Sequence, residues 1–259
     1  MRPKSPKAFA SILSVLTLAS ALAGASASAQ TSWEFGTKKV VGSGHAISVK
    51  RELAPFHGIA VNLPGKVELV QGNSEAIAIE ADDNLLPLIE TVVNNGELTI
   101  RPVKGVNLSG NTKIKITVNV RSVDSLSVAG SADMSAANLV APTLTSSIAG
   151  SGRIRIKDLQ SSALTVSVAG SGRFEAQGAT KAMDVNIAGS GDVSVPKLSA
   201  QDVQISIAGS GDATLWVRKG LTVNIAGSGD VRYYGEGSLR DSSTIGSGRV
   251  KHMGVAPPA

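Results

Sequence analysis

The side chains that could do chemistry recur at one position of a repeated motif. A charged residue directly follows each copy of the tetrapeptide Ala-Gly-Ser-Gly and its variants, about every 20 residues. In chain order these residues are Asp133, Arg153, Arg173, Asp192, Asp212, Asp230 and Arg249. If the copies stack, three acids fall in line, and carboxylate oxygens are ligands for Ca²⁺. The pattern therefore predicts a weak calcium or polysaccharide site at Asp192, Asp212 and Asp230.

A solvated sheet edge explains the same charges, because charge discourages edge-to-edge aggregation. Stacked carboxylates raise at least one carboxyl pKa unless a cation or an arginine neutralises them. Arg173 and Arg249 flank the acids, whereas Asp212 is expected to have no basic neighbour in the column.

A second column contains aromatic side chains. The seventh residues of successive repeats, counted from the turn, are Ala137, Lys157, Gln177, Pro196, Trp216, Tyr234 and Met253. Period-two alternation places this column outside, with Leu215 and Tyr233 inside. Flat rings with a polar tip suit sugar faces and protein partners alike, and a contiguous apolar stripe marks a contact site. Pro196, Trp216, Tyr234 and Met253 are therefore the candidate binding residues. The alternative is that the stripe is covered by the chain itself, by Pro257-Pro258 or by the segment around Trp33 and Phe35.

Other chemical motifs are missing from the sequence. The three histidines, His45, His57 and His252, have no metal-ligand spacing. The Gly-Ser-Gly turns are not expected to bind phosphate, because no helix follows them. No cluster of Lys and Arg with interleaved aromatics supports nucleic-acid binding. We expect no cofactor and no catalytic residue.

The repeats themselves predict the elements that position these side chains. The first glycine of the motif stands at positions 130, 150, 170, 189, 209, 227 and 246. A fixed period near 20 residues is typical of stacked repeats. Each repeat contains two or three short alternating segments, such as Ala163–Val168, and no helical pattern. The pattern predicts an all-β fold, a single-stranded parallel β-helix in which one turn takes about 20 residues and is marked by Ala-Gly-Ser-Gly. A β-propeller blade would need about 40 residues, and a β-sandwich gives no reason for an identical turn at a fixed period.

Two inward columns follow from this reading. One is Ile154, Phe174, Val193, Ala213 and Val231, and the other is Leu164, Met183, Val203 and Leu221. Before the repeats, strands are expected over 57–61, 67–70, 76–80 and 97–100, a short helix or irregular cap over 85–90, and a loop over 106–111.

Four segments are predicted along the chain. Residues 1–29 have the basic start, apolar run and Ala27-Ser28-Ala29 cleavage site of a secretory signal peptide. A linker is expected over 30–41, the β-helix domain over 42–253 with repeats clearest from 112, and a disordered tail over 254–259. The chain has no cysteine, which excludes disulfides and a lipid-anchored cysteine. We expect an exported bacterial protein, in the periplasm, on the outer surface or outside the cell, with no transmembrane segment after signal cleavage.

The sequence also resembles a known family. The resemblance lies in Arg51, Phe56-His57-Gly58-Ile59, 67–72 (Val-Glu-Leu-Val-Gln-Gly), 80–86 (Glu-Ala-Asp-Asp-Asn-Leu-Leu), 96–100 (Gly-Glu-Leu-Thr-Ile) and the repeated Ala-Gly-Ser-Gly-Asp. These residues are similar to the bacterial family labelled "putative auto-transporter adhesin, head GIN domain", over roughly Gly42 to Met253. The resemblance implies a right-handed parallel β-helix, an exported protein and an adhesive or surface role. It implies no catalytic residue.

Two functions remain open at this level. The first is a noncatalytic envelope or cell-surface protein that binds a polysaccharide or an envelope protein in an adhesin-like way. The alternative is a carbohydrate-active β-helix enzyme, a polysaccharide lyase or hydrolase, which rests on fold analogy alone. A pocket of carboxylates would favour the enzyme, and a rod with one apolar stripe would favour the binding protein.

Overall fold

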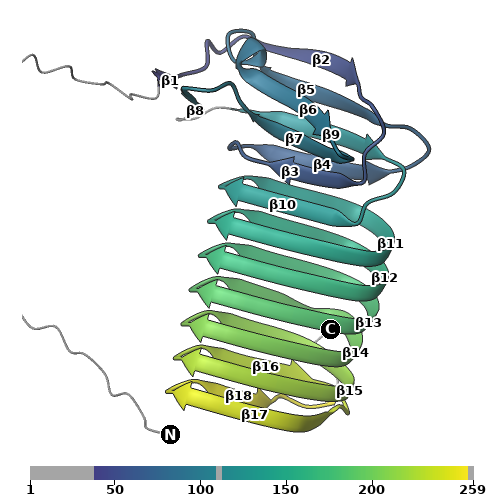
Figure 1. Cartoon of the computed structure of the whole chain (residues 1–259), viewed down its shortest axis with the longest axis vertical. Coiled ribbons are helices and arrows are strands. Elements are labelled where there is room, and N and C mark those ends of the chain that lie inside the picture. Colours follow the sequence, from purple (N-terminus) through teal and green to yellow (C-terminus); the bar gives the residue numbers. More distant parts are fainter. Residues whose placement is uncertain (1–37, 109–112, 256–259) are drawn as a thin grey trace, which may run out of the picture. The chain divides into compact units, whose positions relative to one another are not determined.

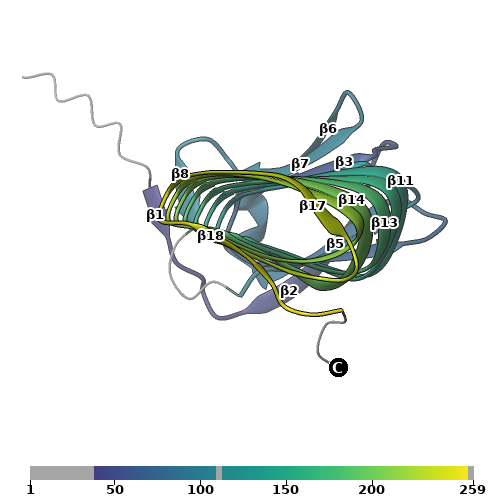
Figure 2. The ribbon, with the colours of Figure 1, turned by 90° about the horizontal axis from the view of Figure 1, so that it is seen from below.

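The computed structural model describes residues 38–108 and 113–255. Over these residues the chain is a parallel β-solenoid, as the repeats predict. Figure 1 shows the successive coils stacked along one axis, and Figure 2 looks along that axis and shows a flattened cross-section. The predicted signal peptide, most of the predicted linker and residues 256–259 of the predicted tail lie outside the described residues.

The regular part of the solenoid begins at the first copy of the motif. One long strand forms most of each coil, instead of the two or three short strands that the sequence predicts, because hydrogen bonding to the neighbouring coils continues around the bend. The strands are β10 (Ser125–Gly130), β11 (Asp133–Gly150), β12 (Arg153–Gly170), β13 (Arg173–Gly189), β14 (Asp192–Gly209), β15 (Asp212–Gly227), β16 (Asp230–Tyr234), β17 (Ser238–Gly246) and β18 (Arg249–His252).

The register between coils is set by the motif. Strands β11 and β12 pair in parallel from Asp133 opposite Arg153 to Gly150 opposite Gly170. The same alignment of the motif glycines continues through β13, β14 and β15. Equivalent residues therefore form columns along the axis, at about 4.8 Å per coil.

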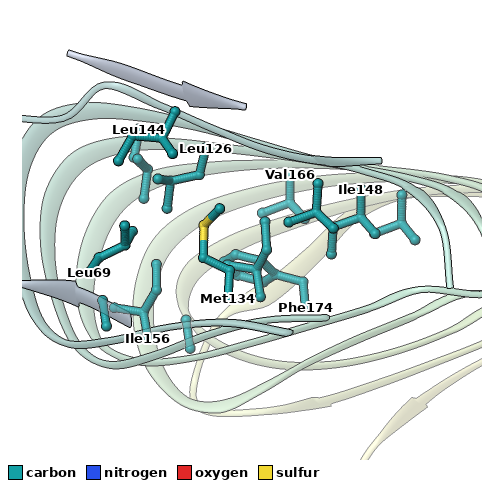
Figure 3. Packing of buried hydrophobic residues seen from close by; sticks show 14 of the residues in the cluster. Leu69, Leu126, Met134, Leu144, Ile148, Ile156, Val166 and Phe174 are labelled. Atoms are coloured by element: carbon teal, nitrogen blue, oxygen red, sulfur yellow. The ribbon is translucent and has the colours of Figure 1, made fainter. Parts of the chain in front are cut away.

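Both predicted inward columns are confirmed. Ile154, Phe174, Val193, Ala213 and Val231 are consecutive partners, and each is at most 1% exposed. Leu164, Met183, Val203 and Leu221 form the second buried column. Figure 3 shows how the two walls meet, with Phe174, Met134 and Ile156 on one side and Leu126, Leu144 and Val166 on the other. These apolar contacts hold the two sheets together.

Two polar side chains are buried among the described residues, Ser146 and Thr180, and Ser146 lies in an inward column. Ser146 is 0% exposed and lies in register between Leu126 and Val166. Its hydroxyl has no hydrogen-bond partner within the part of the chain that the structure describes. A buried hydroxyl without a partner costs about 1–3 kcal/mol. Ser146 therefore makes its coil less stable than an apolar residue at the same position would.

The N-terminal coils are irregular. Their strands are β1 (Lys38–Val40), β2 (Ala46–Glu52), β3 (Gly58–Val61), β4 (Lys66–Gln71), β5 (Ala76–Asp82), β6 (Ile89–Asn94), β7 (Glu97–Pro102), β8 (Val106–Leu108) and β9 (Lys115–Val120). Strand β5 pairs antiparallel with β2 and β9, and β6 pairs antiparallel with β7. A 3-10 helix over Leu86–Leu88 stands where a short helix or cap is predicted.

Two predictions for this region are wrong in part. Residues 106–108 are predicted to be a loop and form β8, and the predicted linker contains β1, which pairs in parallel with β8. Each of these strands is only three residues long, and alternation cannot be recognised over so short a run.

Candidate functional site

The charged column lies on the outer face of the sheet, directly after the corner that the motif forms. Asp192 and Asp212 are register partners, and the backbone N–H of Asp230 donates to Asp212 Oδ1 at 2.9 Å. The three acids therefore stand in line on adjacent coils, as the sequence predicts. Arg173 donates to Asp192, and Arg249 Nη2 donates to Asp230 Oδ2 at 2.9 Å, so the flanking arginines also lie where they are expected.

Asp212 has no basic neighbour within the column, as predicted, but it has one beside the column, Arg232. Arg232 lies two residues beyond Asp230, on the same face of the strand. Its Nη1 is 3.2 Å from Asp212 Oδ2, and its Nη2 is 3.3 Å from Asp230 Oδ2. The sequence interpretation compared residues only within one column, whereas an arginine reaches diagonally into the next.

These contacts decide the electrostatics of the acids. The hydrogen bond from Arg249, supported by the charges of Arg249 and Arg232, lowers the pKa of Asp230 below its usual value. Among the described residues no group of three or more His, Cys, Asp and Glu side chains is arranged to hold a metal ion. Because the arginines already neutralise these carboxylates, calcium binding at Asp192, Asp212 and Asp230 is expected to be weak at most, and this stays a prediction.

The aromatic column is only partly as expected. Trp216 and Tyr234 are register partners on β15 and β16, and both are half-buried. Met253 follows on the next coil, where it is 38% exposed and its N–H donates to the carbonyl of Tyr233 at 2.8 Å. Leu215 and Tyr233 point inward, as predicted. The Arg218 guanidinium lies 5.9 Å from the centre of the Trp216 ring, a cation–π distance.

Pro196 does not belong to this column. Trp216 pairs with Ser199, because the register between β14 and β15 shifts between Ser194 and Ser199. Strand β14 therefore carries extra residues that bulge from the sheet, and Pro196 lies in this bulge. The sequence contains the signal: the step between Gly209 and Gly227 is shorter than the step between Gly189 and Gly209. When one coil has fewer residues than the coil before it, residues at the same count from the turn are no longer register partners.

A hollow of about 230 Å³ lies on the N-terminal side of this bulge. Its charged and polar lining comes from Arg155, Lys157, Glu175, Gln177, Ser194 and Lys197, and Pro196 also lines it. The sequence interpretation did not find it, because Lys157 and Gln177 counted only as the polar part of the aromatic column.

A larger furrow of about 600 Å³ runs along a different face. Two outward columns form it, one of serine and asparagine and one of alanine, and no charged residue lines it. The first column is Ser147, Ser167, Asn186, Ser206, Asn224 and Ser243, and the second is Ala149, Ala169, Ala188, Ala208, Ala226 and Ile245. Ile245, 75% exposed, interrupts the alanine column at the last coil. The furrow was also missed, although the alanine of the repeated tetrapeptide is its signal.

Known proteins resemble both the sequence and the fold. Residues 55–237 match the profile of the family described as "Putative auto-transporter adhesin, head GIN domain". A solved structure of a putative adhesin from Bacteroides fragilis is 22% identical with a TM-score of 0.74, and the alignment covers 83% of this chain and 100% of that chain. A putative lipid binding protein from Parabacteroides distasonis is 23% identical with a TM-score of 0.68, over 83% and 100% of the two chains. A putative adhesin from Parabacteroides merdae is 22% identical with a TM-score of 0.64, over 83% and 99%.

At these identities the likeness to solved structures shows the fold alone. No curated protein matches the chain. Within residues 38–108 and 113–255, no helix is long and apolar enough to cross a membrane.

Proposed function

Because the chain belongs to the family described as "putative auto-transporter adhesin, head GIN domain", we propose that it is a noncatalytic, exported envelope or surface protein that binds a polysaccharide. The observation that carries the proposal is the aromatic platform, defined as Trp216, Tyr234 and Met253. The two aromatic residues lie on adjacent coils, about 4.8 Å apart in backbone spacing, and both are partly exposed. Aromatic rings with a polar tip suit sugar faces. A linear polymer suits a solenoid, because both repeat along one direction.

The aspartates of the charged column give less support to the alternative, a carbohydrate-active enzyme. A glycoside hydrolase needs one carboxylic acid that is protonated near neutral pH, and therefore a raised pKa. The pKa of Asp230 is instead lowered by Arg249, and Asp192 and Asp212 also contact arginines. This column suits ion pairing between coils better than proton transfer. Binding without turnover is therefore the function that we propose.

Replacing Trp216 by alanine tests the platform. We expect polysaccharide binding to fall at least about tenfold, because stacking area is lost at the centre of the contact. The free energy of unfolding should fall by less than the roughly 3 kcal/mol of a fully buried aromatic, since the ring is only half-buried. The measurement is binding to immobilised polysaccharides, with a denaturation curve for each variant.

The matched control is Thr214→Ala, the preceding outward residue of the same strand, which is also half-buried. It should leave binding unchanged. If the wild-type protein retains no polysaccharide of a panel that includes dextran, pullulan and polygalacturonate, the proposal fails. Retention of a purified envelope protein in place of a glycan would also overturn it.

Lipid binding is a second candidate, favoured by the furrow. Its lining is uncharged and contains alanine methyl groups along several coils, and a structure of similar fold is described as a putative lipid binding protein. Ala208 lies in the middle of the alanine column and is exposed. Ala208→Arg should abolish binding of a fluorescent fatty acid by placing a charge in the furrow, while Lys219→Arg elsewhere on β15 should not. A wild-type protein that binds no fatty acid would remove this candidate.

A further inference from the structure

We infer that the polysaccharide is anionic, and that its carboxylate or sulfate groups are held by Lys157, Gln177 and Lys197, named here the lysine ledge. This inference rests on the proposed function and names the chemical class of its ligand. The register between β12 and β13 shifts after Ile156, so Lys157 and Asp158 together stand opposite Gln177. Gln177 pairs directly with Lys197, and Lys157, Gln177 and Lys197 all line the hollow. The three side chains occupy adjacent coils and are all exposed.

The arginines of this face are already occupied. Arg155 Nε is 2.7 Å from Glu175 Oε2, Arg153 is 3.6 Å from Asp133, and Arg173 contacts Asp192. These pairs join neighbouring coils and neutralise one another.

The lysines differ from these arginines. Within residues 38–108 and 113–255, neither Lys157 nor Lys197 has a carboxylate oxygen within the 4.0 Å of an ion pair. The hollow beside them is lined by three cationic side chains and one carboxylate, which Arg155 neutralises. Lys157 and Lys197 are therefore available to an external anion, and the Gln177 amide is a further donor.

The shape of the sheet supports the same ligand. The bulge of β14 relative to β15 contains Pro196 and Lys197, and both residues line the hollow. Lys197 lies two coils beyond Lys157, so their backbones are about 10 Å apart. Successive charged residues of a polymer can pair with both lysines at once.

The lysine ledge is close to the aromatic platform. Lys197 lies two residues before Ser199, and Ser199 is the register partner of Trp216. The backbones of Lys197 and Trp216 are therefore separated by about one coil across and two residues along, or roughly 8 Å. A sugar that stacks on Trp216 thus places the next residues of its chain over the lysines. The furrow, by contrast, has no charged side chain in its lining.

Polygalacturonate and its fully methyl-esterified form are the probes, because they share one backbone and differ in charge. The wild-type protein should bind the acid form at least about tenfold more tightly than the ester, and added salt should reduce this preference. Lys157→Gln with Lys197→Gln should abolish the preference and leave ester binding unchanged. Dextran sulfate compared with dextran forms the second arm, and tells sulfate recognition from carboxylate recognition.

The matched control is Lys50→Gln with Lys115→Gln, which removes the same charge from exposed positions on β2 and β9. It should behave as wild type. If the lysine ledge variant keeps the wild-type preference, or if charged and neutral polymers bind equally and Trp216→Ala weakens both, this inference is wrong and the proposed function stands. If no polysaccharide binds the wild-type protein, the proposed function has failed as well.

Discussion

Gly170→Ala is expected to destabilise the solenoid by on the order of 3 kcal/mol or more, from two separate causes. Gly170 has φ of +109°, a conformation that costs alanine energy because of its Cβ. A Cβ at this position would also lie 2.7 Å from the carbonyl oxygen of Gly150 on the coil before. That oxygen belongs to a paired backbone and cannot move without breaking the ladder between β11 and β12. The measurement is the free energy of unfolding by denaturant titration.

Two other glycines separate these causes. Gly130 has a similar φ of +96°, but nothing lies within 4 Å of its added Cβ, because it occupies the first copy of the motif. Gly130→Ala should therefore show the conformational cost alone, about 1–2 kcal/mol. Gly72 has neither a positive φ nor a close neighbour, and Gly72→Ala should change stability by less than about 1 kcal/mol. An equal loss for Gly130→Ala and Gly170→Ala would show that stacking contributes nothing to the demand for glycine.

The two reasons that require glycine at this position also explain how much of the fold the sequence predicts. A glycine that must fit against the previous coil has to recur once per coil. The number of residues between successive motif glycines is therefore the number of residues in one coil. Alternation then fixes which side chains point inward, which is why the column from Ile154 to Val231 was predicted in full. The repeated glycine motif is absent before Gly130, and the alternation that remains is the same in parallel and antiparallel strands. The antiparallel pairing of β5 with β2 and β9 was therefore not predictable.

The candidate site was less predictable because it depends on local departures from the repeat. Counting from the turn assumes coils of equal length, and the shorter β15 coil breaks that assumption. Trp216 and Tyr234 were placed together correctly because no register shift lies between them. Pro196 was misplaced because one does. The contact of Arg232 with Asp212 was missed for a related reason, since long side chains cross from one column to the next.

The other large effect is expected at the largest side chain of the inward columns. Phe174 is 0% exposed and lies between Ile154 and Val193 in register. Phe174→Ala removes most of the ring and leaves a cavity that paired strands on both sides prevent from closing. We expect the free energy of unfolding to fall by about 3–5 kcal/mol. Because each coil contacts only its neighbours, the loss should concentrate in β12, β13 and β14.

Hydrogen exchange measures where stability is lost, and denaturant titration measures how much. Amides of β12 to β14 should lose protection in Phe174→Ala more than amides of β4 and β9 at the N-terminal end. Phe174→Leu is the control, because it keeps an apolar side chain in the column and should cost clearly less than alanine. A loss below about 1 kcal/mol for Phe174→Ala would mean that the neighbouring coils collapse onto the vacated space. In that case the register of the motif glycines, rather than the packing of the column, would hold the coils in place.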